Sequence, residues 1–109
     1  MLPPDKLQVE VVSPENIREM FNDGQYAAMI ASGRLVATLL RHRHLQHPEQ
    51  KNEPYCTHAQ MIRYSTQNGQ WVVEVFQYLR PDGSIGASGR PDPKRLRIGR
   101  TVFMVQAST

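Results

Sequence analysis

A stretch of fifteen residues, GASGRPDPKRLRIGR at 86–100, combines the residue types that hold phosphate groups. It contains three glycines and five basic side chains, with Asp92 as its one acid. Glycines let the backbone approach a ligand closely, the amides of such a turn can surround an anion, and arginine contacts phosphate bidentately. We therefore expect a phosphate-binding loop formed by Gly86, Ser88, Gly89, Arg90, Lys94, Arg95 and Arg97. The alternative is a basic turn that lies in water, because charge runs are usually solvated.

Four polar side chains upstream of this stretch could take part in RNA cleavage: His58, Arg63, Glu74 and Tyr78. Cleavage without a metal needs a base for the 2′-hydroxyl, an acid for the leaving oxygen and cations for the charged phosphorane. His58 or Glu74 suits the base, and Arg63, Arg90 or Lys94 suits charge stabilisation. The order of elements derived below is similar to that of small bacterial ribonuclease toxins, without a matching family motif. Ordinary cross-strand pairing of these side chains is the competing interpretation.

Histidines gather in RHRHLQH, which places His42, His44 and His47 close together, with Cys56 further on. On the helix that we expect here, residues 42 and 44 point apart, and zinc needs further ligands in a fixed frame. The sequence thus predicts no metal site and no cofactor. Cys56 is the single cysteine, which excludes an internal disulfide and fits a reducing compartment, so we expect a cytoplasmic location.

Positive charge is concentrated in two blocks of a chain whose formal net charge is +3. Residues 34–51 carry a net +3 and residues 80–100 a net +4, whereas residues 1–33 carry a net −3. If the fold brings the two blocks together, they form one surface of positive potential. The expected partner is nucleic acid. The alternative is a protein-interaction or inhibitor protein without chemistry, which would bind an acidic surface of its partner.

Two helices are expected before the sheet. In VVSPENIREMF, Ser13 can cap a helix whose first position is Pro14. A second helix is expected over residues 24–44, because apolar residues from Tyr26 to Leu40 recur at helical spacing.

The period of the apolar residues then changes to that of strands. Strands are expected at 58–65, 71–79 and 101–105, and Asn68-Gly69 predicts a type I′ hairpin turn between the first two. Alternation places five side chains of the second strand on the face that packs against Ile30, Val36 and Leu40. These five are Trp71, Val73, Val75, Gln77 and Leu79.

Together these elements predict a single α+β domain over 1–109. Two N-terminal helices pack on a small antiparallel sheet of three to four strands joined as a meander, with a mobile polar linker at 46–55. Hydrophobic residues make up 39% of the chain, which is typical of globular proteins. No stretch approaches the roughly 20 apolar residues that cross a bilayer, so no membrane association is expected.

Overall fold

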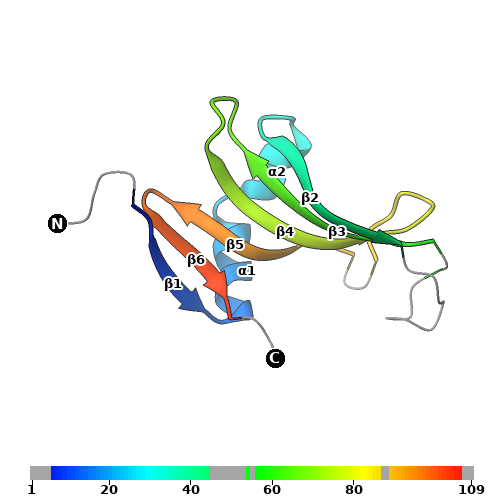
Figure 1. Cartoon of the computed structure of the whole chain (residues 1–109), viewed down its shortest axis with the longest axis horizontal. Helices are drawn as coiled ribbons and strands as arrows, with labels where there is room; N and C mark the ends of the chain where they lie inside the picture. The colour runs from blue at the N-terminus through cyan, green and yellow to red at the C-terminus, as the bar shows by residue number, and fades with distance from the viewer. Residues whose placement is uncertain (1–5, 45–53, 55, 87–88, 107–109) are drawn as a thin grey trace.

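Across residues 6–44, 54, 56–86 and 89–106, which the computed structural model describes, the chain forms a six-stranded sheet and two short helices (Figure 1). The elements in chain order are β1 (Gln8–Val12), α1 (Pro14–Asp23), α2 (Tyr26–Ala31), β2 (Val36–His44), β3 (His58–Ser65), β4 (Trp71–Leu79), β5 (Asp92–Ile98) and β6 (Thr101–Val105). The strand order is β1-β6-β5-β4-β3-β2. Neighbouring strands are antiparallel except β1, which runs parallel to β6. The sheet is therefore mixed.

This architecture corrects the expected fold. The prediction of two N-terminal helices on an antiparallel sheet of three to four strands was wrong, because the described residues form a mixed sheet of six strands. The helix expected over 24–44 ends at Ala31. Gly33 then adopts a left-handed φ of 78°, and β2 begins at Val36. The segment expected to be the second half of a helix is thus an edge strand of the sheet.

Several local predictions agree with the structure. The side chain of Ser13 accepts a hydrogen bond from the amide of Asn16 at 3.1 Å, and Pro14 opens α1. The expected strands at 58–65, 71–79 and 101–105 are confirmed as β3, β4 and β6. The linker expected at 46–55 lies, apart from Pro54, outside the described residues.

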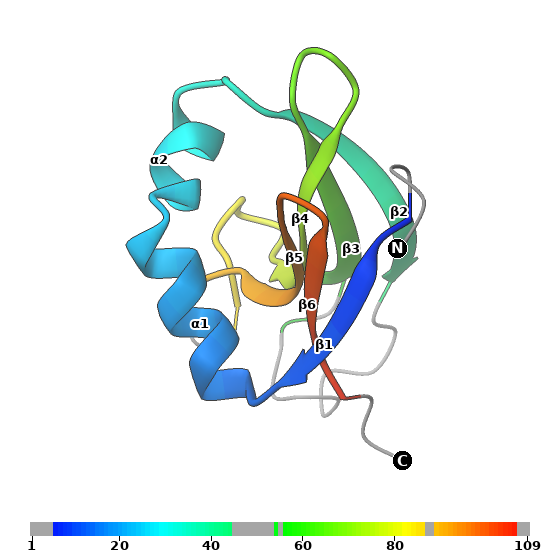
Figure 2. The ribbon, with the colours of Figure 1, turned by 90° about the vertical axis from the view of Figure 1, so that its left-hand side faces the viewer.

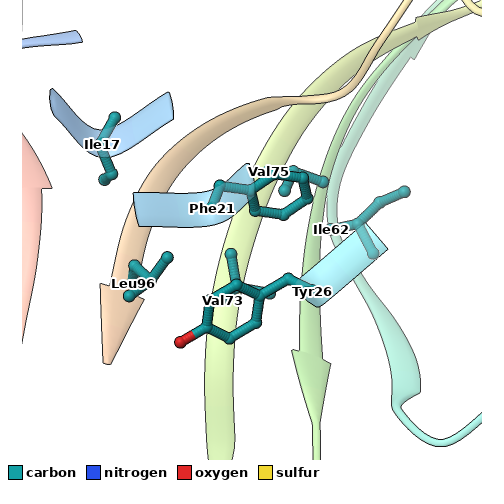
Figure 3. Packing of buried hydrophobic residues seen from close by; sticks show 7 residues of the cluster. All are labelled: Ile17, Phe21, Tyr26, Ile62, Val73, Val75 and Leu96. Carbon is teal, nitrogen blue, oxygen red and sulfur yellow. The ribbon is translucent and has the colours of Figure 1, made fainter. Parts of the chain in front are cut away.

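Both helices cover the same face of the sheet (Figure 2). A cluster of buried side chains fills the space between helices and sheet, and Figure 3 shows it from close by. Its members are Ile17, Phe21, Tyr26, Ile62, Val73, Val75 and Leu96. Val73 and Val75 are fully buried as expected, whereas Val36 and Leu40 are 45% and 40% exposed and do not belong to this core. Burial raises the pKa of the Tyr26 and Tyr64 hydroxyls.

Neither α1 nor α2 covers the opposite face of the sheet. In Figure 2, β5 lies nearest α1, whereas β2 and the start of β1 lie farther from the helices. This curvature makes the helix-free face concave, and strong twist and bulges are the usual cause of such bending. Among the described residues, no helix is long and apolar enough to span a membrane.

The β3–β4 hairpin was predicted correctly, but its turn is of another type. Of the two turn residues Asn68 and Gly69, only Gly69 has a positive φ, at 90°, whereas a type I′ turn needs a positive φ at both. The amide of Gly69 donates to the carbonyl of Thr66, and the amide of Thr66 donates to the carbonyl of Gln70. This pattern fits a three-residue loop in which a type I turn ends in a left-handed glycine.

The turn geometry makes a stability prediction. Gly69→Ala should cost about 1–2 kcal/mol, because an alanine is strained at a left-handed φ. An added Cβ at Gly69 meets no atom within 4 Å, so the cost comes from the backbone alone. Asn68→Ala should cost much less. Urea denaturation of both variants tests this, and equal losses at the two positions would contradict the assigned turn.

Candidate functional site

A groove of about 660 Å³ crosses the concave face of the sheet. Its lining comes from β2, β3, β4, β5 and β6, from Pro14 at the start of α1 and from Gln106 after β6. The lining residues are Pro14, Leu40, Arg41, Met61, Arg63, Glu74, Lys94, Arg95, Met104, Val105 and Gln106. We call this site the groove.

Glu74 is the one acidic residue of the groove lining and is 4% exposed. Its Oε2 accepts from Nη2 and Nε of Arg63, at 2.6 and 2.8 Å, and Nη1 of Arg95 lies 3.8 Å from its Oε1. The three residues are direct cross-strand neighbours on β3, β4 and β5. A carboxylate so deep needs such cationic partners. Glu74 therefore holds two guanidinium groups side by side on the groove floor.

Trp71 belongs to the groove side of the sheet rather than to the core. The register of β3 and β4 shifts between Tyr64 and Ser65, so that Trp71 pairs with Ser65 and Val72 is the extra residue of a bulge. The Arg63 guanidinium lies over the Trp71 ring, 5.5 Å from its centroid. The expectation that Trp71 shares a face with Val73 was thus wrong, because the bulge reverses the alternation.

The groove brings the two basic blocks of the sequence together. Arg41 comes from the first block, and Lys94 and Arg95 come from the second. With Arg63 and Glu74, the groove lining carries four cations and one carboxylate, a net charge of +3. The condition for a single surface of positive potential is met on this face.

A second, larger cleft of about 970 Å³, which we call the side cleft, lies between α1 and the ends of β4 and β5. Asp92 links its two sides, with Oδ1 3.6 Å from Nε of Arg18 and Oδ2 2.9 Å from Nζ of Lys94. Phe76 and Tyr78, whose rings pack edge to face, also line it. Lys94 lines both hollows, so the side cleft and the groove adjoin at this residue.

The stretch 86–100 is not the single loop that was expected, because residues 92–98 form β5. Gly86, Arg90 and Lys94 line the side cleft, and Lys94 and Arg95 line the groove. Gly89 is exposed with a φ of 80°, and Ser88 lies outside the described residues. Nε of Arg97 donates to the carbonyl of Gly99 at 3.1 Å. The backbone of β5 pairs with β4 and β6, so its amides do not form the expected anion-binding nest. A ligand would be contacted by the side chains of β5 instead.

The four candidates for RNA cleavage are not assembled into one site. Arg63 and Glu74 meet in the groove, and Tyr78 lines the side cleft. His58 contacts His42 at the other end of β3. His58 and Arg63 are five positions apart on β3, an odd number, so their side chains lie on opposite faces of the sheet. Glu74 is therefore not paired with His58 as an acid and base.

Sequence reasoning missed Arg41, which lines the groove, and Trp71, which lies on the same side of the sheet. Arg41 was assigned to the end of a helix, although its place in a basic block was the available signal. Trp71 was assigned to the core, because no sequence signal marks the bulge at Val72. Comparisons with protein-family models, with curated proteins and with solved structures found no match to this chain.

Proposed function

We propose that this chain binds single-stranded nucleic acid along the groove, through contacts of Arg41, Arg63, Lys94 and Arg95 with phosphates. The observation that carries the proposal is the convergence of these four cations, from three strands, on one concave sheet face. Proteins that bind single strands combine a positively charged groove with aromatic side chains on which bases stack. Trp71, beside Arg63, is the aromatic group that this arrangement offers.

The distribution of the cations favours a polymer over a small anion. Glu74 already neutralises part of the charge at the centre, through Arg63 and Arg95. Arg41 on β2 extends the cations beyond Arg63 on β3 in the strand order, and Lys94 adjoins Arg95 on β5. Charges that are spread across a groove match phosphates that are spread along a backbone, whereas one small anion would need them focused.

The proposal is binding without cleavage. His58, the best candidate for a general base, lies on the other face of β3 from Arg63, and Glu74 is occupied by two arginines. Among the described residues, the groove thus supplies cations for a phosphate backbone, and no side chain of its lining is placed to act as a base. The ribonuclease alternative predicts fragments of the bound RNA, which the experiment below detects.

The test measures the anisotropy of labelled single-stranded RNA and DNA of about 12 nucleotides, a length within the usual site sizes. With three to four phosphate contacts, log K should fall with log[salt] at a slope of about −2 to −3. Duplex DNA of equal length should bind more weakly, and gels should show intact RNA after incubation. Polyglutamate serves as the acidic control.

Three results would contradict the proposal. Absence of binding at low salt would exclude a nucleic-acid site of any kind. Binding of polyglutamate in preference to both oligonucleotides would favour the acidic protein partner. Fragmentation of the RNA by the purified chain would favour the nuclease.

A further inference from the structure

Aromatic rings form one wall of the side cleft. Phe76 and Tyr78 lie two residues apart on β4, are half-buried and both line the cleft. Their ring centroids are 5.1 Å apart at an interplanar angle of 87°, so each ring is held in place by contact with the other. The buried ring of Phe21 on α1 lines the cleft as well. The side cleft therefore offers a firm aromatic surface to a ligand.

Cations lie directly beside this wall. Asp92 is the cross-strand partner of Phe76, and such partners have Cβ atoms about 4.5–5.5 Å apart. Each carboxylate oxygen of Asp92 contacts one cation, Arg18 from α1 or Lys94 from β5. The side chains of these cations are 53% and 39% exposed, and each carries several N–H donors, so Asp92 uses only part of their capacity. Two cations on one carboxylate leave a net positive charge for an anionic group.

An amide side chain adds a third kind of contact. Asn22 on α1 is exposed and lines the cleft. An amide carries both a donor and an acceptor, and it is the group that pairs with the edge of a base such as adenine. Aromatic, cationic and amide groups thus line one hollow of about 970 Å³, a size within the usual range of small-molecule sites.

We propose that the side cleft binds a nucleoside monophosphate, with its base against Phe76 and Tyr78 and its phosphate on Arg18 and Lys94. Bases stack on aromatic side chains, and arginine suits the geometry of a phosphate. The register that pairs Phe76 with Asp92 brings these two kinds of contact together. Lys94 is the described residue that the side cleft shares with the groove, and the inference does not depend on strand binding in the groove.

The test is a calorimetric titration of the full chain at low salt with adenosine 5′-monophosphate and uridine 5′-monophosphate. One nucleotide should bind per chain. Adenosine and inorganic phosphate, which each carry one half of the ligand, should bind at least about 10-fold more weakly, because stacking and the charged contacts both contribute. Inorganic phosphate that binds as tightly as the nucleotides would overturn the role of the aromatic wall.

Two variants locate the ligand in the cleft. Arg18→Gln should weaken binding of the monophosphates by about 10-fold through the lost charged contact, and Phe76→Leu should do so through the lost stacking. Arg41→Gln is the matched control, because it removes the same charge from a residue that lines the groove and not the side cleft. It should bind the monophosphates as the parent does, and circular dichroism should show that all three variants remain folded.

The outcomes separate this site from the groove. Equal losses in Arg18→Gln and Arg41→Gln would overturn the side cleft as the site, as would parental affinity in Phe76→Leu. If neither monophosphate binds while single-stranded RNA does, the side-cleft proposal fails and the groove proposal stands. If the monophosphates bind as described and RNA does not, the groove proposal fails alone.

Discussion

Leu96→Ala is expected to lower the free energy of unfolding by about 3–5 kcal/mol, near the upper end of the range for buried leucines. Leu96 is fully buried on β5, where it pairs with Val73 of β4. Helix α1 packs directly on β5, and Ile17 and Phe21 of that helix belong to the same cluster (Figure 3). Truncation leaves a cavity between two rigid layers that cannot close fully.

Leu40→Ala is the matched control, since it removes the same atoms from a residue that is 40% exposed on β2. It should cost clearly less than Leu96→Ala, because Leu40 keeps 40% of its surface in contact with water and lies outside the buried cluster. Urea denaturation with a common m-value measures both. A loss at Leu40 as large as that at Leu96 would mean that residues 36–44 belong to the core, as the helix prediction required.

That contrast shows where sequence reasoning failed on the fold. Five of the six residues at 35–40 are apolar, with Thr38 as the exception. Such a short run fits both helical spacing and a strand, and periodicity alone does not decide between them. Two features make residues 36–44 a strand. The left-handed φ of Gly33 ends the helical segment, and β2 pairs with β3, which follows it in the chain after a stretch outside the described residues. Local signals, such as the Ser13 cap and the Asn68-Gly69 hairpin, were read correctly because their causes are local.

The candidate site was predictable in composition but not in arrangement. The sequence identified Arg63, Glu74, Lys94 and Arg95, and the structure brings these four into one groove. Their meeting depends on strand order and on the bulge in the pairing of β4 with β5, where Lys94 is the extra residue. A bulge moves side chains to the other face without a marker in the sequence.

The groove itself is tested by changing Arg41, Lys94 and Arg95 together to glutamine. Three lost phosphate contacts should shallow the slope of log K against log[salt] by about 2 for a single strand. Counterion release adds nothing near 1 M salt, where the triple variant and the parent should bind single-stranded RNA equally. At 0.1 M salt the affinity of the variant should then be about 100-fold lower than that of the parent. Arg63 is left in place because it is the closest partner of the buried Glu74.

The control for this variant must remove the same charge from elsewhere. Lys6, Arg34 and Arg100 are exposed and do not line the groove, so their combined change to glutamine lowers the net charge equally. If binding depends on position, this control keeps most of the parental slope, whereas a diffuse attraction to a basic protein weakens alike in both variants. Equal slopes in the two triple variants would therefore contradict the groove as the binding site, even if the parent binds RNA. A shallow slope in the groove variant alone would locate the phosphates on Arg41, Lys94 and Arg95.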